Sequence, residues 1–144
     1  MIRYVLDASV AAKWFLAGPG EDLVEQAVRL LRLYTAGGAE FIVPDLFFAE
    51  FAAVLGKAER LGRCDRQATD RAVEEVLGWN LRTFPTASLL RRAVAISRAW
   101  GCSLYDAVYL SLAEQATISM ITADERLVRA VGGRLPVLWL GALP

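Results

Sequence analysis

The chain contains no histidine, and this absence excludes several kinds of active site. Without an imidazole there is no Ser-His-Asp or Cys-His catalysis, no histidine-type zinc site and no histidine general base. The two cysteines, Cys64 and Cys102, lack a metal-ligand spacing, so we expect them to be buried or free thiols.

Net charge is also missing, because sixteen basic and sixteen acidic side chains cancel. The chain thus has no overall positive field to attract nucleic acid, and a polyanion must be held by a local patch or by bound metal. Lysine is almost absent: Lys13 and Lys57 are the only two, and every other basic residue is arginine. The planar fork of arginine suits phosphate, although a base-composition bias of the genome explains the same excess.

Long apolar runs are lacking, and we find neither a leader pattern nor an uncharged apolar segment of about eighteen residues. We therefore expect a soluble, cytoplasmic protein. The chain is nevertheless 56% hydrophobic, more than a typical soluble domain, so part of its surface is expected to meet a partner. A length of 144 residues fits one domain, 1–144.

Short apolar segments alternate with helical patterns along the chain. We predict strands at 4–6, 41–43, 81–84, 117–121 and 136–140, and helices at 9–16, 21–34, 45–61, 65–79, 88–100, 103–115 and 122–131. Asp45 is predicted to cap the third of these helices. The alternation predicts an α/β fold with a parallel sheet covered by helices on both faces.

Asp7 directly follows the first strand, where a helical pattern begins. In parallel α/β sheets, ligands bind outside the carboxyl ends of the strands, so an acid at this turn lies where such folds carry out their chemistry. The alternative is that Asp7 or Ser9 only caps the next helix.

Three further acids occupy apolar surroundings: Glu50 among phenylalanines and alanines, Asp106 in an otherwise uncharged segment, and Asp124 after an apolar strand. Removing an ionised carboxylate from water without a partner costs several kcal/mol in practice, or raises its pKa until it is neutral. The turns and helix starts that carry these acids share one edge of a parallel sheet, together with Asp7. A divalent cation such as Mg²⁺, which prefers oxygen ligands, would stabilise such a cluster of carboxylates.

Each of these acids also has a structural explanation. Ser103–Asp106 and Thr122–Glu125 both resemble capping boxes, with aspartate in place of glutamate in the first. Asp124 could be one of the acids that favour a first helical turn. Glu50 lies too far into its helix to cap it, but it could pair with a distant arginine.

Four motifs in this order resemble those of the PIN-domain ribonucleases, and most closely the VapC-type toxins of bacterial and archaeal toxin–antitoxin pairs. They are Val5-Leu6-Asp7-Ala8-Ser9-Val10 with Lys13-Trp14-Phe15, Val43-Pro44-Asp45-Leu46 followed by Glu50, Ser103-Leu104-Tyr105-Asp106-Ala107-Val108-Tyr109, and Ile121-Thr122-Ala123-Asp124-Glu125-Arg126-Leu127. The resemblance spans nearly the whole chain. It implies a PIN-like three-layer α/β/α sandwich with a central, mostly parallel sheet of four to five short strands.

The resemblance also implies a site and a function. The acidic quartet that binds Mg²⁺ or Mn²⁺ would be Asp7, Glu50, Asp106 and Asp124, supported by Ser9 and Thr122. The family cleaves single-stranded or loop RNA and is held inactive by a VapB-type antitoxin, usually as a homodimer that carries two antitoxins, a heterotetramer or larger. Hydrolysis by a metal-activated water in an in-line displacement would leave a 5′-phosphate and a 3′-hydroxyl.

Other residues near the motifs have two interpretations each. Lys13 could reach a phosphate, but a solvated helix face is the favoured interpretation. Five aromatic residues could form a groove for a partner helix, although such stripes belong to the core more often; they are Trp14, Phe15, Phe47, Phe48 and Phe51.

Three other functions compete with the ribonuclease. A receiver-type phosphotransfer domain would use Asp7 for Mg²⁺, but it needs a lysine after a late strand, and both lysines precede residue 58. A catalytically silent PIN-like module that binds RNA or protein has no use for clustered carboxylates. A flap-type DNA nuclease normally needs a longer chain.

Overall fold

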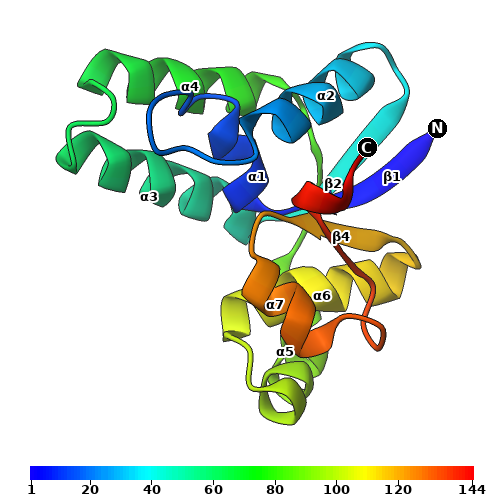
Figure 1. Cartoon of the computed structure of the whole chain (residues 1–144). Coiled ribbons are helices and arrows are strands. Elements are labelled where there is room, and N and C mark those ends of the chain that lie inside the picture. The colour runs from blue at the N-terminus through cyan, green and yellow to red at the C-terminus, as the bar shows by residue number, and fades with distance from the viewer.

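In the computed structural model, which describes residues 1–144, a five-stranded sheet lies between two layers of helices (Figure 1). The strands are β1 (Ile2–Leu6), β2 (Ala39–Pro44), β3 (Arg82–Phe84), β4 (Ser119–Thr122) and β5 (Val137–Trp139). Their order is β3-β2-β1-β4-β5, and every neighbouring pair is parallel. The predicted three-layer α/β/α sandwich is confirmed, and its sheet is entirely rather than mostly parallel.

The helices cover both faces of this sheet. They are α1 (Ala8–Lys13), α2 (Val24–Thr35), α3 (Leu46–Arg60), α4 (Arg66–Gly78), α5 (Thr86–Trp100), α6 (Leu104–Ala116) and α7 (Glu125–Val131), with a 3₁₀ turn at Leu140–Ala142. In Figure 1, α1 to α4 lie on one side of the sheet and α5 to α7 on the other. Because parallel crossovers are right-handed, chain segments that step outward in opposite directions from the centre place their helices on opposite faces.

The strand order reverses between β1 and β4. From β1 the chain steps outward to β2 and β3, and it then returns through α5 and α6 to β4 on the other side of β1. Such a reversal opens a crevice at the carboxyl ends of the two strands, which is where open α/β sheets bind their ligands. Asp7 and Asp124 follow these two strands.

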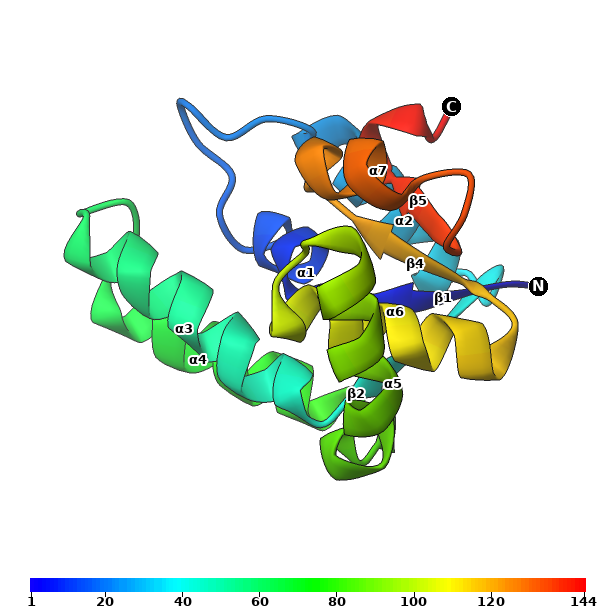
Figure 2. The same cartoon turned by 90° about the horizontal axis from the view of Figure 1, so that it is seen from below.

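Helices α3 and α4 form an antiparallel pair that extends beyond the sheet, as both views show (Figures 1 and 2). Three large apolar side chains on this pair and its connection are exposed: Val54, Leu61 and Leu77. No helix combines the length and the apolar character that crossing a membrane requires.

The aromatic cluster belongs to the core. Phe47 and Phe51 are fully buried, and Trp14, Phe15 and Phe48 are partly buried against the same core. The favoured interpretation is therefore confirmed. Trp14 Nε1 also donates a 2.7 Å hydrogen bond to the Ala27 carbonyl, so the indole joins α1 to α2.

The prediction that Asp45 caps α3 is wrong. Asp45 precedes that helix in helical backbone geometry, with no side-chain cap bond. Its Oδ1 instead accepts a 2.9 Å hydrogen bond from the backbone N–H of Thr86 and a second bond from the Thr86 hydroxyl. Because β2 and β3 are neighbours, Asp45 ties the end of β2 to the start of α5.

Candidate functional site

Asp7 is held rigidly at the junction of β1 and α1. Its side chain is buried, and its backbone N–H donates to the Ile121 carbonyl of β4 at 3.2 Å. Asp7 Oδ2 accepts hydrogen bonds from Ser9 Oγ and from Thr122 Oγ1, both at 2.7 Å. The side chain makes no capping bond to α1, so the alternative that Asp7 is only a helix cap is wrong.

The hydroxyls of Ser9 and Thr122 join the turns after β1 and β4. Ser9 Oγ accepts a hydrogen bond from the Ala123 N–H at 3.2 Å, and Thr122 Oγ1 accepts one from the Asp124 N–H at 3.1 Å. Each hydroxyl therefore donates a hydrogen bond to Asp7 and accepts one from a backbone N–H of the turn after β4. Ser9 and Thr122 thus contact one acid of the quartet, Asp7, while their support of a metal-binding quartet stays a prediction.

Asp124 is the residue that caps α7. Its Oδ1 accepts from the N–H groups of Arg126 at 2.9 Å and Leu127 at 3.2 Å. The capping box expected at Thr122–Glu125 is therefore wrong, because the aspartate inside it is the cap and Thr122 bonds to Asp7. Capping occupies only Oδ1 of Asp124, so the other carboxylate oxygen stays available to a ligand.

Asp106 is the third residue of α6. Its N–H donates to Ser103 Oγ at 3.0 Å, so only half of the expected capping box forms. The charges of Asp7 and Asp124 add to the effect of burial in raising the pKa of its carboxyl group, and Asp106 lines one pocket together with Asp124. The N-terminal turn of α6 thus brings Asp106 to the crevice between β1 and β4.

Glu50 is the fifth residue of α3 and reaches the same place from the other helical layer. It forms no salt bridge, so the alternative of a distant arginine partner is not found. Glu50 Oε1 is buried without a hydrogen-bond partner. An unpaired buried carboxylate oxygen is costly, which marks this atom as one that lacks a ligand.

The carboxylates influence one another's ionisation. Burial raises the pKa of Glu50 to about 7, and the charges of Asp7 and Asp106 add to the rise. Burial also raises the pKa of Asp106 to about 6, with contributions from Asp7 and Asp124. The pKa of Asp7 is raised by burial, against which the Ser9 and Thr122 hydrogen bonds act. Asp7, Glu50 and Asp106, which are far apart in the sequence, thus share one electrostatic environment, and the charge of Asp124 acts on Asp7 and Asp106.

This donor set suits a hard divalent cation. Four carboxylates supply oxygen ligands, no basic side chain pairs with any of them, and one buried oxygen lacks a partner. No three of the carboxylates are already close enough together to hold one ion. Binding therefore requires side-chain rotation, for which exposed Asp124 and half-buried Asp106 have room. The identity of the four acids as ligands stays a prediction.

A surface pocket of about 260 Å³ adjoins this crevice. Its lining includes Asp106, Asp124, Cys102 and Arg126. The Arg126 guanidinium is exposed and forms no salt bridge, so it is a free positive charge beside two of the acids. An anionic group could be held here next to the carboxylates.

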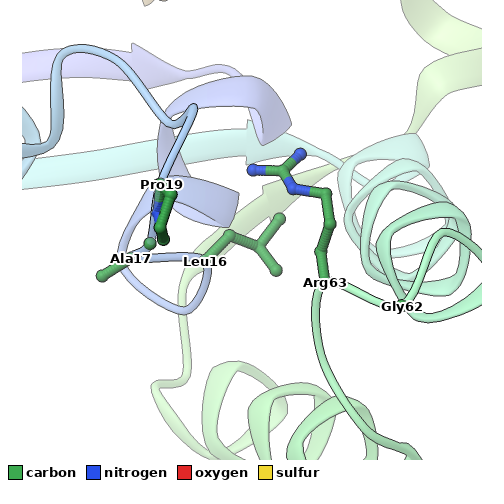
Figure 3. A pocket seen from close by; sticks show the side chains of 6 residues that line it. Leu16, Ala17, Pro19, Gly62 and Arg63 are labelled. Carbon is green, nitrogen blue, oxygen red and sulfur yellow. The ribbon is translucent and has the colours of Figure 1, made fainter.

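A second pocket, of about 210 Å³, lies away from the acids (Figure 3). The loop after α1 and the end of α3 line it, and the Arg63 side chain extends from the α3 end toward the loop. Arg63 pairs with Glu21, which in turn pairs with Lys13 at 2.7 Å. Because no acid of the quartet lines this pocket, it is not the candidate site.

The prediction that Lys13 lies on a solvated helix face is wrong. The side chain is buried, and Nζ donates to Glu21 Oε1 at 2.7 Å, to the Asp22 carbonyl at 2.7 Å and to Asp22 Oδ1 at 3.0 Å. A buried ammonium needs such partners, and the loop folds back to supply them. These bonds occupy the ammonium, so it is not free to contact a phosphate either.

Tyr109 is a site residue that the sequence analysis missed. Its side chain is fully buried, and its hydroxyl lies near Glu50 and Asp7, whose charges together with burial raise the pKa of Tyr109. Tyrosine in an apolar helix looks like a core residue. The available signal was its spacing, because a residue three positions after Asp106 lies on the same side of α6.

Comparison with known proteins agrees with this fold. The PIN domain family matches residues 4–133 of the chain. The chain is 39% identical over 87 residues to Ribonuclease VapC3 of Mycobacterium tuberculosis, an alignment that covers 60% of this chain and 62% of the relative, less than two thirds of its length. It is 30% identical over 142 residues to Exonuclease VapC9 of Pyrobaculum aerophilum, covering 94% of this chain and 91% of the relative.

Solved structures share the fold at low sequence identity. A toxin–antitoxin complex from Klebsiella pneumoniae matches with a TM-score of 0.61 and 16% identity, over 94% of this chain and 95% of that one. Mycobacterium tuberculosis VapC20, described as a sarcin-ricin loop cleaving toxin, matches with a TM-score of 0.62 and 18% identity, over 90% and 95% of the two chains. The resemblance to VapC proteins is confirmed, and the match over residues 4–133 shows that the chain belongs to the PIN domain family.

Proposed function

We propose that this chain is a divalent-metal-dependent endoribonuclease and the toxin of a type II toxin–antitoxin pair. The observation that carries the proposal is the group of four carboxylates at the sheet crevice, which has no basic partner and leaves Glu50 Oε1 buried and unpaired. Asp7, Glu50, Asp106 and Asp124 would hold Mg²⁺ or Mn²⁺. When bound, such a cation lowers the pKa of water and neutralises charge on a phosphodiester.

The other residues orient these ligands. Ser9 and Thr122 fix the Asp7 carboxylate through two 2.7 Å hydrogen bonds to Oδ2. The other oxygen, Oδ1, is left for the metal. The α7 N–H groups hold one oxygen of Asp124, Oδ1. Asp7 would thus be ordered before a metal binds, which lowers the free-energy cost of binding, while Asp106 and Asp124 would still have to rotate.

The substrate class follows from the open form of the site and from the relatives. Single-stranded or looped RNA can present its backbone to a shallow surface pocket beside the acids, and Arg126 would contact a phosphate there. The VapC relatives are named ribonuclease and exonuclease, and VapC20 is described as a sarcin-ricin loop cleaving toxin. With no net charge on the chain, this local contact would replace a general positive field.

The proposed partner is a VapB-type antitoxin, bound to a homodimer in a heterotetramer or larger assembly. The Klebsiella pneumoniae neighbour is a toxin–antitoxin complex. Exposed apolar side chains at the α3–α4 pair also support the proposal of a protein partner. Leu61 and Leu77 are 65% and 54% exposed, and a partner could cover them. We expect the toxin to act in the cytoplasm, where its RNA substrates are.

The test compares the wild-type chain with Asp7→Asn, which keeps the side-chain shape and removes the charge. Induced expression should arrest growth for the wild type only, and the purified protein should cleave RNA with Mg²⁺ or Mn²⁺ but not with EDTA. The matched control is Asp70→Asn, an exposed residue of α4 that should remain toxic. Metal-independent cleavage, or a toxic Asp7→Asn variant, would refute the proposal.

A further inference from the structure

The Tyr109 hydroxyl and Glu50 Oε1 are both buried, and neither has a hydrogen-bond partner of normal geometry. The phenol nevertheless lies within reach of the Glu50 carboxylate, and the charge of Asp7 helps to raise the pKa of both groups. A buried tyrosine hydroxyl normally finds a partner, and so does a buried carboxylate oxygen. Two complementary groups, one donor and one acceptor, are therefore left unpaired side by side.

The position of Tyr109 follows from the helix that carries it. Tyr109 is three residues after Asp106 in α6, so the helix that brings Asp106 to the crevice also directs this side chain toward it. Phenylalanine would fill the same core volume without burying a hydroxyl, as Phe47 and Phe51 do in α3. Burying the hydroxyl has a free-energy cost that core packing does not explain.

We propose that Tyr109 is a positioning residue whose hydroxyl donates a hydrogen bond to Glu50 and orients this carboxylate toward a bound divalent cation. The inference rests on the proposed function, in which Glu50 is a metal ligand. The terminal torsion of a glutamate side chain is broad, so a modest rotation of Glu50 completes the bond. With one oxygen of the Glu50 carboxylate held by this bond, the other oxygen is oriented toward the cation.

The chemistry of a tyrosine suits this role. A lysine or arginine would also donate to Glu50, but its positive charge would compete with the cation for the carboxylate. A hydroxyl donates one hydrogen bond without adding charge, so the negative charge of the four acids remains for the metal. Hydrogen bonds to metal-ligating carboxylates matter, since their loss typically lowers metal affinity or activity by about 10- to 100-fold.

The experiment measures Mn²⁺ binding by electron paramagnetic resonance, without RNA, for the wild type and Tyr109→Phe. We expect Tyr109→Phe to weaken Mn²⁺ binding about 10-fold. Its melting temperature in EDTA should be unchanged or higher, because the variant loses only a buried hydroxyl that has no partner. The matched control is Tyr34→Phe, whose ring packs on Phe41 away from the acids and whose Mn²⁺ affinity should equal the wild type.

A double-mutant cycle separates positioning from a general effect on folding. In a Glu50→Ala background, Tyr109→Phe should cause no further loss of Mn²⁺ affinity, because the carboxylate it orients is gone. Equal losses in both backgrounds would overturn the inference, and so would wild-type affinity in Tyr109→Phe. A wild-type chain that binds no Mn²⁺ at millimolar concentration would instead refute the proposed function itself.

Discussion

Thr122 Oγ1 donates a 2.7 Å hydrogen bond to Asp7 Oδ2, although 115 positions separate the two residues in the chain. The contact exists because β1 and β4 are neighbours in the sheet while lying at opposite ends of the sequence. Both residues are buried, so the bond is shielded from water. It fixes the geometry of the crevice at the point where the strand order reverses.

Replacing Thr122 with valine removes the hydrogen bond to Asp7 but keeps nearly the same side-chain shape. The variant therefore distinguishes the contribution of the bond from that of packing. We expect Thr122→Val to lose about 1.5–3 kcal/mol of stability, as for hydrogen bonds to charged groups. Metal affinity should fall about 10-fold. Thermal denaturation and Mn²⁺ titration measure the two effects. Thr35→Val, which removes a hydroxyl bonded only within α2, is the control; equal behaviour of both variants would contradict the role of Thr122.

The stability of the metal-free protein should decrease as the pH rises. The fold raises the pKa of Glu50 from 4.5 to about 7, so the native state keeps a proton that the unfolded chain has already released. The associated stability is fully present below pH 4.5 and is lost as the pH rises through about 7. Raised pKa values at Asp106 and Asp7 act in the same direction.

Melting temperatures measured in EDTA at several pH values would test this dependence. The range from about pH 4 to about pH 8 brackets the pKa of about 7. Glu50→Gln cannot ionise, so its melting temperature should decline less across the range and exceed that of the wild type at the alkaline end. Added Mg²⁺ should restore the wild type there, because binding to the native state stabilises it. A wild type that gains stability with rising pH would contradict the prediction.

Arg126 should affect substrate binding and not metal binding. Arg126→Ala removes the free guanidinium from the pocket beside Asp106 and Asp124. We expect KM for a short RNA to rise about 10-fold with little change in kcat, since a phosphate contact of this kind contributes on the order of 1–2 kcal/mol. Mn²⁺ affinity should not fall. Arg129→Ala, one turn further along α7 and paired with Glu125, is the control.

Lys13 should be required for stability. Lys13→Met keeps the length of the side chain but removes the ammonium that Glu21 and Asp22 surround. We expect a loss of up to about 3 kcal/mol, because the buried ammonium and its bonds are removed and Glu21 keeps only Arg63 as a charged partner. Urea denaturation measures it, with Lys57→Met as the control. An unchanged midpoint together with a raised KM for RNA would show that Lys13 contacts substrate after all.

The ends of the cleaved RNA report the direction of attack. Water attack on the phosphodiester leaves a 5′-phosphate and a 3′-hydroxyl, and a protein without histidine has no imidazole pair to activate the 2′-hydroxyl instead. Ligation of the products to an adaptor that requires a 5′-phosphate should therefore succeed without prior treatment. A 2′,3′-cyclic phosphate at the cut would contradict this mechanism.

The sequence by itself determined the order of strands and helices and the position of the acids within it. Strand-forming runs before Asp7 and Asp124 predict their turns, because the local change from period two to helical spacing is encoded in adjacent residues. Glu50 and Asp106 could be singled out because a charge in an apolar segment is visible without a structure. The absence of histidine is equally visible in the sequence, and it excludes active sites that need an imidazole.

Only the tertiary structure decided which groups meet. Asp45 resembles a helix cap in sequence but bonds to Thr86 across the sheet, and Lys13 resembles an exposed lysine but is buried under the loop that carries Glu21. Tyr109 resembles a core residue in sequence, but in the folded chain its hydroxyl lies near Glu50 of another helix. Hydrogen bonds and burial depend on distances through space between distant segments, and local sequence patterns carry no information on those distances.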